Sequence, residues 1–145
     1  MLIRPIVDSD VESVIALWTQ CDLTRPWNDP VADIRRARQT ASAEIFIGTE
    51  EPGALIAAVM CGHDGHRAWL YYLAVAPNRQ RQGLGRAIVE HAENWLRQQG
   101  APKIELMIRD TNRDMTQFYE SVGYRTEPVI TMSRWLTTPT ALPDD

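Results

Sequence analysis

The chain has 145 residues and a mass of 16.5 kDa, the size of one domain, which argues against a multidomain assembly. Apolar residues make up 44% and charged residues 23%, as in folded proteins and unlike disordered chains. The 15 basic residues are outnumbered by 19 acidic ones, so the chain has no overall basic field that would attract nucleic acid.

Cysteine and histidine usage gives no sign of a metal site. Cys21 and Cys61 are too few for a disulfide scaffold or a four-thiolate site, and the three histidines show no metal-ligand spacing. The first residues lack the apolar core of a signal peptide, and no stretch approaches the roughly 20 apolar residues that cross a bilayer. We therefore expect a cytoplasmic protein with no metal, no membrane partner and no nucleic-acid partner.

The first part of the chain predicts a strand followed by two helices. Leu2 to Ile6 is typical of a short strand, and Ser9 with Glu12 forms a capping box that predicts a helix start. Asp29 then offers an N-cap for a second helix over roughly Pro30 to Thr40, which begins with the proline favoured in a first turn.

The middle of the chain predicts a hairpin, a further strand and a long helix. Residues from Glu44 to Thr49 and from Ala54 to Cys61 flank a Pro-Gly turn, as in a β-hairpin. Strand character resumes over Ala68 to Val75. Apolar residues at helical spacing follow from Leu84 until Gly100, and glycine commonly ends a helix.

The last third predicts a strand, a short helix and one or two final strands. Apolar residues alternate from Ile104 to Ile108 as in a strand, and Met115 to Ser121 fits a short helix. One or two strands are then expected from Tyr124 to about Trp135. We expect a single domain over residues 1–137 and a short tail over residues 138–145.

A positively charged segment lies between Gly65 and Val89. It contains four arginines and no acidic residue, although the whole chain has a net charge of -4. Within it, Gly83 and Gly85 stand between a predicted strand and the long helix. Glycines let the backbone approach a ligand, and the first amides and the dipole of a helix favour an anion. The segment suits a pyrophosphate, although a plain turn with solvated arginines would have the same composition.

The two commonest phosphate-binding motifs do not match this segment. A dinucleotide-binding loop needs a third glycine where Ile88 stands, and a P-loop needs Gly-Lys-Ser/Thr, which is missing here. A different anion-binding family is therefore required.

Two motifs resemble those of the GNAT family, the GCN5-related N-acetyltransferases. The acetyl-CoA loop of that family reads Gln/Arg-x-x-Gly-x-Gly/Ala, and its positions are filled here by Gln80, Gly83 and Gly85. The family's downstream pattern of Asn, Phe-Tyr-Glu and Gly-Phe/Tyr is similar to Asn112, Phe118-Tyr119-Glu120 and Gly123-Tyr124. The resemblance extends to the bacterial YpeA-like acetyltransferases through the segments Cys21 to Pro30 and Asp64 to Arg67, and so covers nearly the whole chain.

The resemblance implies a fold and a co-substrate. The fold is the acyl-CoA N-acyltransferase fold, an α/β (α+β) architecture with a mixed, mostly antiparallel sheet of about six or seven strands and about four helices. The co-substrate is acetyl-CoA, whose pantetheine arm would lie along the strand that holds Leu73, Ala74 and Val75. Its pyrophosphate would meet the loop residues Gln80, Arg81, Gln82, Gly83, Leu84, Gly85 and Arg86.

Tyr119 is the candidate for chemistry, because a phenol with a pKa near about 10 can donate a proton to a departing thiolate. The same ring would also fit a packing role between the short helix and the sheet. Asn112 resembles the family's cofactor-contacting asparagine, and it stands equally well where an ordinary helix cap would.

The general base is not identified by the sequence. Many relatives place a carboxylate on the central strand, but the stretch from Trp69 to Tyr72 holds no acid. The residues that stay open as direct or water-mediated bases are Glu105, Asp22, Asp29 and His66.

The segment between the first two helices is expected to contact the acceptor. It holds Arg25, Trp27 and Asp29, and Glu105 on a later strand is a further candidate. Aspartates would favour a cationic amine and arginine a carboxylate, so an amino acid, a polyamine and a peptide terminus all stay open. A loop locked by a buried indole and a helix cap would account for the same residues.

The sequence therefore predicts an acetyl-CoA-dependent N-acetyltransferase that acts on a primary amine of a small molecule, peptide or protein. Direct attack in a ternary complex is expected, because neither cysteine lies in the cofactor or tyrosine motifs. The alternatives are a non-catalytic acyl-CoA-binding or sensing module, and a protein-partner module that pairs through the final strands. Many proteins of this fold dimerise, so a homodimer stays open.

Overall fold

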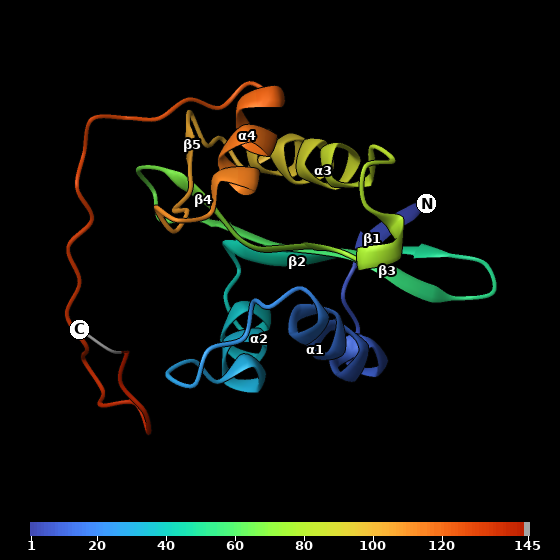
Figure 1. The fold of residues 1–145 in the computed structure, drawn as a ribbon, viewed down its shortest axis with the longest axis horizontal. Coiled ribbons are helices and arrows are strands. Elements are labelled where there is room, and N and C mark those ends of the chain that lie inside the picture. The colour runs from blue at the N-terminus through green and yellow to red at the C-terminus, as the bar shows by residue number, and fades with distance from the viewer. Residues whose placement is uncertain (144–145) are drawn as a thin grey trace.

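The structure, a computed structural model that describes residues 1–143, is built around a five-stranded sheet with helices on both faces (Figure 1). In chain order the elements are β1 (Leu2–Pro5), the 3-10 helix η1 (Asp8–Asp10), α1 (Val11–Gln20), α2 (Pro30–Arg38), β2 (Ala43–Glu50), β3 (Ala54–His63), β4 (Ala68–Val75), the 3-10 helix η2 (Pro77–Arg79), α3 (Leu84–Gln98), β5 (Ile104–Glu105) and α4 (Arg113–Ser121).

The sheet follows the order of the chain. Neighbouring strands from β1 to β4 are antiparallel, and β5 joins β4 in parallel. Helices α1 and α2 lie on one face, and α3 and α4 lie on the other (Figure 1). The mixed, mostly antiparallel α+β architecture with four α-helices confirms the expected fold class.

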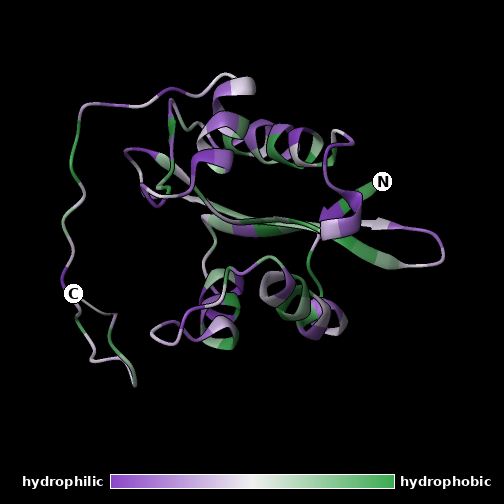
Figure 2. Cartoon of the chain, in the orientation of Figure 1, coloured by the Kyte–Doolittle hydropathy of each residue, from purple (hydrophilic) through white to green (hydrophobic). Residues whose placement is uncertain are grey.

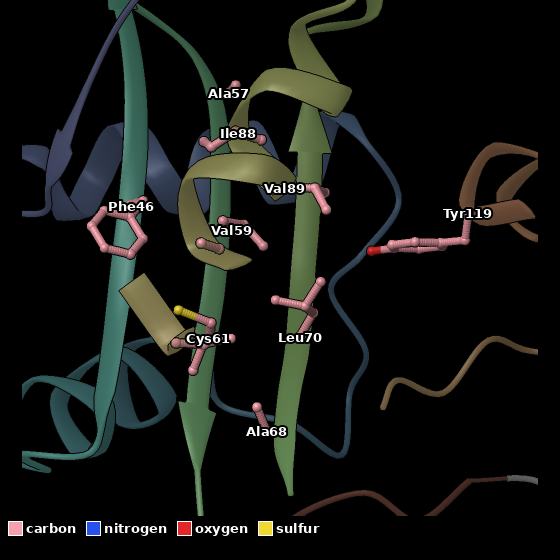
Figure 3. Packing of buried hydrophobic residues seen from close by; sticks show 11 residues of the cluster. Phe46, Ala57, Val59, Cys61, Ala68, Leu70, Ile88, Val89 and Tyr119 are labelled. Carbon is pink, nitrogen blue, oxygen red and sulfur yellow. The ribbon is translucent and has the colours of Figure 1, made fainter. Parts of the chain in front are cut away.

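Each face of the sheet has its own apolar core. Buried residues of α3 at helical spacing, including Ile88 and Ala92, pack against Val59, Cys61 and Leu70 of the sheet (Figure 3). The other face is covered by apolar residues of α1 and α2, among them Val14, Trp18 and Ile34. The apolar sides of these helices turn toward the sheet and their polar sides turn outward (Figure 2).

Local sequence signals placed one helix start correctly and another wrongly. The Asp29 carboxylate caps α2, accepting hydrogen bonds from the amides of Val31 at 3.0 Å and Ala32 at 3.2 Å. The Ser9 cap is wrong, because α1 begins at Val11 after a 3-10 turn and Asp10 turns its side chain back toward β1.

The expected strands between Tyr124 and Trp135 are wrong. Of the residues that the structure describes, none after β5 forms a strand, so the sheet has five strands and not six or seven. The chain after α4 runs along the side of the molecule without joining the sheet, and it leaves Val129, Ile130 and Met132 exposed (Figure 1). A strand needs a partner edge, and β5 offers only two residues. Asp144 and Asp145, the end of the predicted tail, lie outside the described residues.

None of the helices within residues 1–143 is long and apolar enough to cross a bilayer.

A partly buried ion pair joins β1 to the 3-10 helix η1. Arg4 on β1 donates two hydrogen bonds to Asp10, at 2.7 and 3.0 Å, and the Val7 amide donates a third at 2.8 Å. The hydrogen bond from Arg4 holds the pKa of Asp10 below its usual value, although partial burial opposes that shift. A lowered carboxylate pKa stabilises the fold above the unfolded value of about 4, and this contribution is lost as pH falls through the folded value.

We expect Asp10→Ala to lower the free energy of unfolding by about 2 kcal/mol, because it removes the ion pair with Arg4 and leaves the Val7 amide without its acceptor. Urea denaturation at neutral pH measures this change. The matched control is Asp8→Ala, since Asp8 pairs with Arg38 while its side chain is 93% exposed, and it should cost less than about 0.5 kcal/mol. The difference in the free energy of unfolding between the wild type and Asp10→Asn should narrow as pH falls below about 4, because the Asp10 carboxylate then becomes protonated. A difference that stays constant with pH would contradict the lowered pKa of Asp10.

Candidate functional site

The sheet opens along one edge of β4. Strands β4 and β5 pair only at Ala68 with Ile104 and at Trp69 with Glu105, so β4 has no strand beside this edge from residue 70 onward. The β3–β4 register also shifts between Ala58 and Met60. Apart from the Val75 carbonyl, which accepts hydrogen bonds from side chains, the backbone edge from residue 70 to Val75 is therefore free to pair with an extended ligand. The expected cofactor-binding residues Leu73, Ala74 and Val75 all lie in this stretch.

Two side chains from neighbouring elements converge on the end of β4. The Cys21 thiol, directly after α1, and the Gln80 amide both donate to the Val75 carbonyl, at 3.3 and 3.2 Å. Burial raises the pKa of the Cys21 thiol, which keeps it protonated as a donor. Gln80 thus ties the glycine loop to the strand before it.

The glycine loop ends in an uncapped helix. Gly83 is the N-cap of α3 with a left-handed φ of 80°, and no side chain caps the helix. The amides of Leu84, Gly85 and Arg86 precede the helical hydrogen bond from Ala87 to Gly83. Such amides, together with the helix dipole, form an anion-binding site.

The arginines of the loop have different surroundings. Arg79 forms a two-pronged ion pair with Glu50 on β2, and Arg86 donates to the Ser121 carbonyl at the end of α4, at 3.0 Å. Arg81 is exposed with a left-handed φ of 60°, and it makes no hydrogen bond or ion pair to any residue in the described range. Gln82 accepts a hydrogen bond from Arg79 at 3.1 Å. Arg81 therefore leaves its charge available beside the uncapped helix.

Tyr119 projects from α4 toward the sheet. Figure 3 shows its ring lying between α4 and β4 with the hydroxyl leading toward β4. The side chain is buried, in edge contact with the rings of Phe118 and Tyr124 at centroid distances of 5.1 and 5.3 Å. Burial raises the pKa of Tyr119, so the phenol stays protonated at neutral pH. Asn112 caps α4, accepting from the Met115 amide at 3.2 Å.

A cavity of about 880 Å³ lies beside Tyr119. It is bounded by α3, β5, α4 and the chain that follows α4, and its lining includes Tyr119 and Glu105. The glycine loop does not line it, so the cavity and the uncapped helix are separate features. Glu105 is engaged there in ion pairs with Arg67 and Lys103, both at 3.7 Å.

The expected acceptor residues are largely occupied by their own loop. Asp29 caps α2, as described above, and Arg25 donates to the carbonyls of Asp22 and Thr24 at 2.8 and 2.9 Å. Trp27 is half-buried, with the guanidinium of Arg109 5.6 Å from its ring centre. The loop between α1 and α2 therefore meets the chain after β5, a contact that the sequence analysis missed.

The other candidate bases are exposed. The Asp22 side chain is 95% exposed, and His66 lies in the open turn between β3 and β4. In that turn Asp64 accepts hydrogen bonds from the His66 and Arg67 amides, which lower its pKa. Within residues 1–143, no cluster of three or more histidine, cysteine, aspartate or glutamate side chains could hold a metal.

Sequence reasoning also missed a contact across 39 residues of chain. The Tyr72 hydroxyl on β4 donates to the Asp33 carboxylate on α2 at 2.6 Å. Tyr72 has a left-handed φ of 55°, which is rare for a bulky residue and cannot be read from a sequence. The one signal in the sequence was that the stretch from Trp69 to Tyr72 holds no acid, which leaves a carboxylate to be supplied by another element.

Comparison with known proteins agrees with this geometry. Residues 12–124 match the Acetyltransferase (GNAT) family. An acetyltransferase of Yersinia enterocolitica is 40% identical over 136 residues, 94% of this chain and 96% of that protein. An acetyltransferase of Pectobacterium atrosepticum is also 40% identical, with the same shares covered.

Solved structures share the fold. The aminoglycoside enzyme AAC(6')-Iy, in complex with the bisubstrate analogue CoA-S-monomethyl-acetylneamine, superposes with a TM-score of 0.79 at 17% identity, covering 92% of this chain and 97% of that one. The glucosamine-6-phosphate N-acetyltransferase of Arabidopsis thaliana has a TM-score of 0.74 at 20% identity, covering 94% and 98%.

Proposed function

Because this chain belongs to the GNAT family of acetyltransferases, and is therefore an acetyl-CoA-dependent N-acetyltransferase, we propose that it acetylates a primary amine by direct attack in a ternary complex, with Tyr119 as general acid. The acceptor is a small molecule or the amine of a peptide or protein. The observation that carries this proposal is that a helix without a side-chain cap, a free β4 edge and a buried phenol directed at β4 lie together.

Binding of the co-substrate uses the backbone. The first amides of α3 hold the pyrophosphate, with Arg81 adding charge, and the free edge at Leu73, Ala74 and Val75 holds the pantetheine arm. Side-chain identity along β4 matters little for this contact, because main-chain groups make it.

The chemical step breaks the thioester C–S bond as the amine nitrogen forms a C–N bond with the carbonyl carbon. The departing thiolate takes the phenol proton of Tyr119, and the proton that nitrogen loses on forming the amide restores the phenol through solvent. Tyr119 is suited to this part because burial keeps it protonated until negative charge builds on sulfur.

The test is a screen of the purified chain with acetyl-CoA against spermidine, free amino acids and a lysine-containing peptide. Release of the coenzyme A thiol is followed with DTNB, and mass spectrometry of the product locates the acetyl group. We expect acetylation of an amine in one of these classes. Binding of acetyl-CoA without transfer to any of them would contradict the proposal.

A further inference from the structure

Tyr72 is held in an unusual conformation by two neighbours. Its φ of 55° lies in the left-handed region, which is strained for a bulky residue and persists only where the surroundings impose it. Its ring stacks on the fully buried indole of Trp18, with centroids 3.9 Å apart and planes 9° apart. Its hydroxyl donates to Asp33 at 2.6 Å. Strain retained in this way is found most often at functional sites.

The register shift in β4 explains where the ring lies. Tyr71 is opposite Met60 and Ala74 is opposite Ala58, so Tyr72 and Leu73 together face the single residue Val59 of β3. Tyr72 packs with the core beneath α1 and α2. Tyr119 packs with the opposite core, so the two phenols lie on opposite faces of the sheet.

The proposed reaction requires a group that removes a proton from the acceptor. A primary amine with a pKa near about 10 is protonated at neutral pH and cannot attack until it loses that proton. β4 carries no acid, but α2 brings the Asp33 carboxylate to the hydroxyl of Tyr72. Asp33 is also paired with Arg36, which orients the carboxylate.

We propose that Tyr72 and Asp33 together deprotonate the acceptor amine. This proposal rests on the proposed function and supplies the general base that the reaction requires. The Tyr72 oxygen accepts a proton from the ammonium group while its own proton passes to Asp33. The amine then holds a free electron pair for the C–N bond, and the protonated Asp33 returns its proton to water. Tyr72 is the catalytic residue of this pair, and Asp33 acts through it.

The surroundings contain few groups that would disturb this transfer. The charged groups that act on Tyr72 are Asp33 and Arg36, both of α2, while α1 presents the indole of Trp18, which does not titrate. Burial and Asp33 raise the pKa of Tyr72, so the phenol relays a proton and does not act as a phenolate. Tyr71 beside it also has a raised pKa, from burial and Asp64.

The experiment measures kcat/KM for the amine found in the screen, across pH, for Asp33→Asn, Tyr72→Phe and the double variant. Asparagine still accepts the hydrogen bond from Tyr72, and phenylalanine still stacks on Trp18, so both should fold. Near pH 7 we expect each to lose about 100-fold or more in kcat/KM. The loss in kcat/KM should shrink toward pH 10, because the fraction of acceptor amine that is already unprotonated rises about tenfold per pH unit below its pKa of about 10. The double variant should lose no more than either single variant, since one relay is removed.

The matched control is Glu12→Gln, an exposed carboxylate on α1 that should leave the pH profile unchanged. Binding of acetyl-CoA, measured by calorimetry, should be the same in all variants. An equal loss at every pH would overturn the proposal in favour of a structural role, and so would wild-type activity of Asp33→Asn near pH 7. If the wild type binds acetyl-CoA but acetylates no amine, the proposed function fails and the base assignment fails with it.

Discussion

Replacing Tyr119 with phenylalanine is expected to lower kcat by about 100-fold or more while leaving the binding of acetyl-CoA unchanged. The substitution removes only the hydroxyl, so the ring can keep its edge contacts with Phe118 and Tyr124. The thiolate would then leave without a proton donor in a buried site, where separated charge is costly. Steady-state kinetics with the acceptor from the screen, beside calorimetry with acetyl-CoA, measure both quantities.

Tyr124→Phe is the matched control for this experiment. Tyr124 touches Tyr119 and lines the same cavity, but its buried hydroxyl makes no hydrogen bond to any residue that the structure describes. We expect this variant to keep near wild-type kcat and to be no less stable, because it removes a buried polar group without a partner. Equal losses in the two variants would mean that the tyrosine cluster serves packing.

Gly83→Glu is expected to raise the dissociation constant of acetyl-CoA by about 100-fold, or about 2.7 kcal/mol. The loss of affinity comes from a carboxylate placed where first-turn amides and the helix dipole would hold a pyrophosphate. A φ of 80° also disfavours any residue with a Cβ by about 1–2 kcal/mol, and this strain lowers the stability of the fold. Titration calorimetry gives the affinity directly, and circular dichroism checks that the fold persists.

The same substitution at the other end of α3 separates backbone strain from binding. Gly100 has a φ of 84° and open space around it, as Gly83 does. Gly100→Glu should therefore lose a similar amount of stability while binding acetyl-CoA normally. An unchanged affinity in Gly83→Glu would refute the assignment of the loop.

The parts of the fold that the sequence predicted depend on short-range signals. The apolar stripe of α3, the hairpin turn and the Asp29 cap each involve residues within a few positions of one another. The final strands depend instead on a partner edge elsewhere in the chain. Tyr124 to Trp135 has apolar residues typical of strands, but no pairing forms after β5 within residues 1–143.

In the candidate site, too, the features that were predictable come from contiguous residues and the others from contacts between distant segments. The glycine loop was predictable because its glycines, its arginines and the helix start are contiguous. The pair of Tyr72 and Asp33 was not, because it joins two elements and depends on a left-handed backbone within a strand. The contact between Arg109 and Trp27 likewise depends on how two loops meet.

Gly85 lies where two parts of the site touch. A Cβ at this position would approach two ring carbons of Phe118 to 3.2 Å, and Phe118 precedes Tyr119 on α4. Even a methyl group there would require the Phe118 ring to shift by a few tenths of an ångström, and a larger side chain would press further on α4, which also carries Tyr119. Substitutions at Gly85 should therefore lower turnover as well as the affinity for acetyl-CoA, so mutational libraries of this segment should leave Gly85 intact.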